Sequence, residues 1–166
     1  RAVRHSFIAG NGSFILLTKA GGDPPFLLMS PKLGTSIVCF DINNTNDAGR
    51  FEGGYSVFLH AAKKNKDKIW RLPTPSKILD SKESLNYGFD FKWVETYDQV
   101  RDALYESDLY DIRVMPGMSI PTNLDCRISI RSKTKSLDII SEYPGDTEIA
   151  KIIKKDSHYL FVIRFK

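Results

Sequence analysis

The sequence predicts an all-β protein: an antiparallel two-sheet β-sandwich of about ten strands, with one short helix near residues 96–107. Three observations support this class. Short apolar runs alternate with a two-residue period, turn residues separate the runs, and a single segment has helical spacing. Short turns leave little room for the crossovers of a parallel sheet. We therefore expect two packed antiparallel sheets, with a closed barrel or a jelly roll as the alternative.

The strand-like runs are rich in β-branched and aromatic residues, which favour extended backbone. In chain order they are residues 13–18, 26–30, 35–42, 54–62, 69–72, 86–94, 109–115, 124–131, 136–143, 148–153 and 158–165. The last two are separated by the turn "KKDS" and predict a hairpin. In 124–131, Cys126 and Ile128 alternate with Arg127 and Ser129. This alternation is typical of an antiparallel sheet with one wet face.

One segment, 96–107, has helical spacing instead. Its apolar stripe consists of Tyr97, Val100, Ala103 and Leu104. Thr96 and Gln99 have the spacing of a capping box, in which each side chain bonds a free backbone amide of the other residue. Asp98 lies in the first turn, where the helix dipole favours an anion. The pattern predicts a helix of about three turns.

Aromatic side chains supply the candidate carbohydrate contacts. In 86–94, an alternating stripe contains Tyr87, Phe89, Phe91 and Trp93. Such a stripe either fills a core or stacks on sugar rings, and we favour the core. Trp70 and Arg71 end the run 69–72 and are better placed for the surface. We name Trp70, Arg71 and Trp93 as candidate glycan contacts.

Composition excludes several classes of protein. The 166 residues are 42% hydrophobic and 27% charged, as in a soluble globular domain. No apolar run is long enough to span a bilayer. The net charge of +4 is mild and the lysines lie in turns, so we expect no nucleic-acid partner. Cys39 and Cys126 lie in strand-like runs without metal-ligand spacing, which favours buried free thiols over a disulfide.

The segment 41–52 is the best metal candidate. Oxygen-bearing side chains occupy positions 1, 3, 5, 7 and 12 of this loop: Asp41, Asn43, Thr45, Asp47 and Glu52. That spacing can wrap calcium. Asn46 stands where such loops carry glycine, and the flanking runs predict strands rather than helices. A polar hairpin loop is therefore the favoured interpretation, and we expect no cofactor other than this calcium candidate.

No catalytic residue can be assigned from the sequence. The chain has three histidines, His5, His60 and His158, and no serine in a G-x-S-x-G elbow. Acidic residues such as Asp98 and Asp102 gather around the predicted helix. Neighbours on one exposed helix face do not oppose each other across a cleft, as a glycosidase pair must. A solvated acidic face is the favoured interpretation.

Three segments carry a family resemblance: "GDPPFLLMSP" (22–31), "DIRVMPGMSIPTNL" (111–124) and "SHYLFVIRF" (157–165). They resemble parts of the N-terminal β-sandwich domains of large multidomain bacterial carbohydrate-active enzymes. In those enzymes a helical toroid that follows the sandwich carries the catalytic acids. The resemblance implies a non-catalytic module that packs on a catalytic domain elsewhere in the same protein. It carries over no catalytic residue to this chain.

The expected function follows from these points. The chain, 1–166, is expected to be one β-sandwich domain. Because it lacks an initiator Met, we expect a processed protein or, preferably, a part cut from a longer one. The resemblance implies that this protein is secreted or periplasmic. We expect it to pack on the missing catalytic domain and to contact polysaccharide weakly. One alternative is a protein-interaction or ligand-binding module that uses Arg113, Arg127 and Arg131. A small stand-alone enzyme is the least favoured reading.

Overall fold

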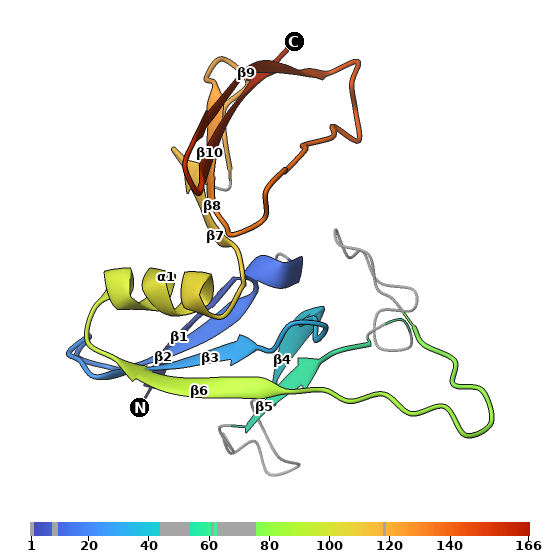
Figure 1. Cartoon of the computed structure of the whole chain (residues 1–166). Coiled ribbons are helices and arrows are strands. Elements are labelled where there is room, and N and C mark those ends of the chain that lie inside the picture. The colour runs from blue at the N-terminus through green and yellow to red at the C-terminus, as the bar shows by residue number, and fades with distance from the viewer. Residues whose placement is uncertain (1, 8–9, 44–53, 61, 63–75, 118) are drawn as a thin grey trace. The chain divides into compact units, whose positions relative to one another are not determined.

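The structure is a computed structural model that describes residues 2–7, 10–43, 54–60, 62, 76–117 and 119–166 (Figure 1). The chain divides into two compact units, Arg1–Thr96 and Tyr97–Lys166. Eight strands form two four-stranded sheets, one in each unit, and two further strands form a hairpin.

The N-terminal unit is built on a sheet with the order β1-β2-β3-β6, in which all neighbours are antiparallel. Its strands are β1 (Ala2–Phe7), β2 (Phe14–Lys19), β3 (Phe26–Pro31) and β6 (Phe89–Val94). The 3-10 helix η1 (Gly10–Gly12) joins β1 to β2. The hairpin pairs β4 (Cys39–Asn43) with β5 (Gly54–Phe58). Because β6 is last in the order β1-β2-β3-β6, it is an edge strand of the four-stranded sheet.

One face of the β1-β2-β3-β6 sheet is buried. Leu16 of β2 lies opposite Leu28 of β3, and Phe26 of β3 lies opposite Val94 of β6. All four side chains are buried. Because side chains alternate along each strand, the residues between them point to the other face. Leu27 and Met29 of β3, and Phe91 and Trp93 of β6, therefore lie on the opposite face of the sheet.

The C-terminal unit begins with the helix α1 and continues as a sheet with the order β7-β8-β10-β9 (Figure 1). Its elements are α1 (Tyr97–Glu106), β7 (Asp111–Met115), β8 (Cys126–Arg131), β9 (Thr147–Lys155) and β10 (His158–Phe165). All strand pairs are antiparallel, and the β9–β10 register shifts between Val162 and Ile163. Tyr159 and Phe161 of β10 and Cys126 of β8 share the buried face.

The helix confirms most of the sequence prediction. Val100, Ala103 and Leu104 are buried. Tyr97, the first helical residue and the fourth member of the predicted stripe, is instead 57% exposed.

The helix ends in a tight C-terminal motif. The Leu109 amide donates to the Leu104 carbonyl at 2.9 Å, and the Asp108 amide donates to the Tyr105 carbonyl at 3.2 Å. Asp108 has a φ of 60°, the left-handed conformation that usually ends such a helix. These bonds satisfy carbonyls that the last helical turn would otherwise leave free. The turn therefore fixes the direction in which the chain enters β7.

The antiparallel all-β class with two main sheets and one short helix is confirmed. One predicted strand is wrong, and one observed strand was not predicted. Residues 136–143 form no strand; the carbonyls of Thr134 and Lys135, just before them, accept bonds from the Tyr159 hydroxyl instead of from a strand. β1 was missed because "AVRHSF" lacks apolar alternation. The predicted strand 69–72 lies outside the described residues, and the single domain stays a prediction.

Two phenylalanines on strands offer a matched test of this core. Phe161 is fully buried, whereas Phe91 is 63% exposed. We expect Phe161→Ala to lower the free energy of unfolding by about 3–5 kcal/mol, since it removes a buried ring and leaves a cavity. Phe91→Ala should lower it by less than about 1 kcal/mol. Urea denaturation followed by circular dichroism measures both, and equal losses would contradict the assignment of buried faces.

Candidate functional site

Most of the sequence-based candidates lie outside the described residues. These are Trp70 and Arg71 among the glycan contacts, and Thr45, Asp47 and Glu52 of the calcium loop. The backbones of Asp41 and Asn43 lie in β4, paired with Ser56 and Gly54 of β5. Within the described residues, no group of three or more His, Cys, Asp or Glu side chains is placed to hold a metal ion. The calcium loop stays a prediction.

The aromatic stripe on β6 is exposed. Trp93 is 66% exposed and Phe91 63%. They lie opposite Leu27 and Met29 of β3, on the face of the sheet opposite Leu28 and Val94. Ile15 and Pro31 on this same face are buried, so the exposed part of it lies around the two rings. The core interpretation is therefore wrong for these two rings. Val94 takes the buried position instead, because the pleat turns every second side chain of the strand to the other face.

One histidine in the N-terminal unit has an aromatic partner. The His60 Nε2 atom lies 2.5 Å from the Tyr87 hydroxyl, and the two rings meet edge to face with centroids 5.7 Å apart. Both side chains are exposed. Neither residue lines either of the two pockets described below. The pair ties the end of β5 to the segment that leads into β6.

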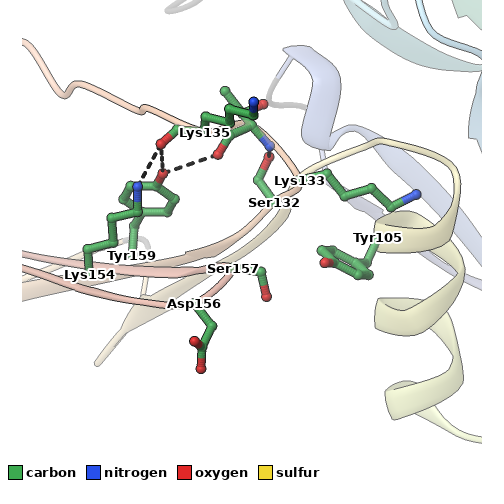
Figure 2. Close-up of a pocket in the computed structure, with 9 residues that line it drawn as sticks. Tyr105, Ser132, Lys133, Lys135, Lys154, Asp156, Ser157 and Tyr159 are labelled. Carbon is green, nitrogen blue, oxygen red and sulfur yellow. Dashed lines mark hydrogen bonds between the residues drawn. The ribbon is translucent and has the colours of Figure 1, made fainter.

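A basic pocket of about 480 Å³ lies at one end of the C-terminal sheet (Figure 2). We name it the lysine–tyrosine pocket. Its lining residues are Tyr105, Ser132, Lys133, Thr134, Lys135, Lys154, Asp156, Ser157 and Tyr159. They come from α1, the segment that follows β8, and the β9–β10 hairpin. Three lysines and one aspartate give the lining a formal charge of +2.

Hydrogen bonds fix one wall of this pocket. The buried Tyr159 hydroxyl donates to the Lys135 carbonyl at 2.8 Å and to the Thr134 carbonyl at 3.1 Å. The Lys154 ammonium donates to the same Lys135 carbonyl at 2.7 Å (Figure 2). The Ser132 amide donates to the Ser157 carbonyl at 2.9 Å. The segment after β8 is thereby held against the hairpin.

Tyr105 lines the other side of the pocket, and two cations lie over its ring. The Arg131 guanidinium lies 4.1 Å from the centre of the Tyr105 ring, and the Lys133 ammonium lies 5.5 Å from it. Arg131 also pairs with Asp102 at 2.7 Å, and Lys133 pairs with Asp108 at 2.9 Å. These contacts hold the end of α1 against the residues at the end of β8.

The arginine face predicted for a protein partner is only partly free. Arg113 lies opposite Ser129, so it shares a face with Arg127 and Arg131. Arg131 is occupied by Asp102 and by the Tyr105 ring. Arg127 lines a second pocket of about 530 Å³. The other residues of that pocket are Met115, Pro116, Asn123, Leu124 and Asp125.

Sequence reasoning missed the lysine–tyrosine pocket. The lysines at 133, 135 and 154 are visible in the sequence as short basic turns, which are usually solvated. The turns lie about twenty residues apart in the chain, and only the pairing of β8 with β10 and of β10 with β9 brings them together. The available signal was the basic turn 133–135 after the predicted strand 124–131, together with the basic turn 154–155 before the predicted strand 158–165.

Two buried ionisable groups lie on the C-terminal sheet. Burial raises the pKa of the Cys126 thiol, which is free. Burial also raises the pKa of Asp111, although Arg101, Arg131 and His158 oppose the rise. The Asp111 carboxylate lies 3.5 Å from Arg101 and 3.9 Å from Arg113.

The raised pKa of Asp111 predicts a pH dependence of stability. An acid whose pKa is higher in the folded state binds its proton more tightly there, so its contribution to stability falls as pH rises from about 3.8 through the raised pKa. Asp111→Asn removes this titration. The free energy of unfolding of the variant, relative to the parent, should therefore increase over that window. Urea denaturation at a series of pH values measures the difference, and a decrease would contradict it.

Among the helices described, none is long and apolar enough to cross a membrane.

Comparison with known proteins finds a likeness in structure. No family model matches the sequence, and no curated protein matches it. A solved structure described as a polysaccharide lyase has a TM-score of 0.67 and 12% sequence identity, over 100% of this chain. This chain spans 22% of the length of that one. At this identity the likeness concerns the fold, which is that of one part of a carbohydrate-active enzyme.

Proposed function

We propose that the chain is a non-catalytic β module of a larger polysaccharide-processing protein, which packs on a catalytic domain and makes weak contact with glycan. The fold likeness supports the setting, because the whole chain corresponds to about a fifth of a polysaccharide lyase. A secreted or periplasmic location suits this role, since polysaccharides are met outside the cytoplasm.

The exposed aromatic pair on β6 carries the proposal. A tryptophan and a phenylalanine, two residues apart on an edge strand, stand more than 60% exposed beside Leu27 and Met29. Apolar side chains that gather on one sheet face mark an interaction surface. Flat aromatic rings also accept the C–H faces of sugars, while the same area can be buried by another domain.

A packing role explains the position of this surface better than a closed active site does. Phe91 and Trp93 are exposed on an edge strand, and neither lines one of the two described pockets. Enzyme sites are concave and bring several polar groups together. Exposed apolar side chains on an edge strand can be buried against a partner without that convergence. We therefore assign the main role to packing and the minor one to glycan contact.

A glycan titration tests the contact. In a Trp70→Phe background, Trp93 is the only tryptophan, because the chain has two. Neutral oligosaccharides should change its fluorescence weakly and saturably, and Trp93→Ala should abolish their calorimetric signal. Tyr143→Ala is the control, since Tyr143 is an exposed aromatic residue of the other unit. No response to any glycan on an array, or equal losses in both variants, would reject the contact.

A further inference from the structure

We infer that the lysine–tyrosine pocket is a binding site for a carboxylate-bearing sugar unit of an acidic polysaccharide. The inference rests on the proposed function for its setting, but it concerns the Tyr97–Lys166 unit and residues that the aromatic pair on β6 does not involve. Three properties of the pocket support it: a wall that is already formed, uncompensated positive charge, and a dense set of hydroxyl groups.

The wall is formed before any ligand arrives. The Lys135 carbonyl accepts from both the Tyr159 hydroxyl and the Lys154 ammonium, at 2.8 and 2.7 Å. The Ser132 hydroxyl, on a buried residue, accepts from the Thr134 amide at 3.0 Å. These bonds leave the segment after β8 little freedom to lose on binding. A preformed site loses less conformational entropy when it takes up a ligand.

The positive charge is not fully compensated. Lys133 pairs with Asp108, so its charge is largely balanced. Lys154 bonds a neutral carbonyl and keeps its whole charge. Among the described residues, the Lys135 ammonium forms no ion pair. Asp156 is the single acid in the lining, which leaves the pocket attractive to an anion.

The remaining lining suits a sugar rather than a simple anion. Three residues of the lining, Ser132, Thr134 and Ser157, carry hydroxyl groups, although that of the buried Ser132 is already bonded to the Thr134 amide. Hydroxyls both donate and accept, which matches the hydroxyl groups of a pyranose ring. The volume of about 480 Å³ lies within the range of small-ligand sites. A carboxylate would meet the Lys135 and Lys154 ammoniums while the ring hydroxyls meet the serine and threonine side chains.

The geometry favours a glycan over a nucleic acid. Single-stranded nucleic acid is held by bases stacked on free aromatic faces. Here the Tyr105 ring is covered by Arg131, and Tyr159 is buried beside Phe161 with Lys154 over its ring. The pocket thus offers charge and hydroxyl groups but no open ring. Binding of an oligonucleotide is therefore an outcome that the test must distinguish.

The experiment compares two ligands that differ only in the carboxylate. The parent protein is titrated by calorimetry with a short galacturonic acid oligomer and with a galactose oligomer of the same length. The acidic oligomer should bind, and more weakly as salt is added, since salt screens exposed charges. Lys135→Glu should weaken its binding by about tenfold or more, as expected for loss of one charge-assisted contact. Lys135→Arg should retain most of the affinity.

Lys151→Glu is the matched control. It makes the same charge change as Lys135→Glu, but on β9. Lys151 lies opposite Val162, whereas Lys154 lies opposite Tyr159, so Lys151 is on the other face of the sheet from Lys154. We expect it to change the affinity by less than about twofold. Equal weakening by both variants, or equal binding of an oligonucleotide, would overturn the inference in favour of a general charge effect. No binding of the acidic oligomer would also overturn it, while the separate Trp93 titration reports on the proposed function.

Discussion

The alternation of side chains along antiparallel strands is the constraint on which the rest of this structure depends. In each unit the pleat sends one set of apolar residues inward. In the N-terminal unit these include Leu16 and Leu28, and in the C-terminal unit Tyr159 and Phe161. Everything that is left for binding must come from the other face or from the ends of the strands. Both candidate surfaces follow this rule: the β6 aromatic pair lies on an opposite face, and the lysine–tyrosine pocket lies at strand ends.

The fold class could be predicted because alternation is a local property of the sequence. The final hairpin shows this well, since its two runs and the turn between them are visible in order, and β9 and β10 form there. Similarly, the helix was found from three buried residues at helical spacing. β1 could not be found, because its sequence has no apolar rhythm and its extended form depends on pairing with β2.

Burial of a given stripe was harder to predict than the strand that carries it. The sequence shows that Phe91 and Trp93 share a face, but not whether that face points inward. That choice depends on Phe26 and Leu28, on a strand more than sixty residues earlier, whose buried side is shared with Val94. The lysine–tyrosine pocket could not be predicted for the same reason. Its lysines lie in turns that resemble ordinary solvated turns, and only the strand order β8-β10-β9 shows that they meet.

The helix terminus and the sheet end act together in the C-terminal unit. The left-handed residue Asp108 that ends α1 is also the ion-pair partner of Lys133. Lys133 in turn donates to the Glu106 carbonyl at 3.0 Å, in the last helical turn. A cation at this position is stabilised by the negative end of the helix dipole. The same contacts that finish the helix therefore set the position of one lysine in the pocket lining.

The place of β9 at the end of the strand order has a consequence for solubility. A nine-residue strand at a sheet border offers its outer amides and carbonyls to any extended chain that approaches, and its isoleucines would favour such growth into fibrils. Lys151, Lys154 and Lys155 place like charges along that border, and the shifted register at Val162 and Ile163 bends it. A second copy of the strand would meet repulsion and a mismatched curve, so these lysines also protect the protein against aggregation.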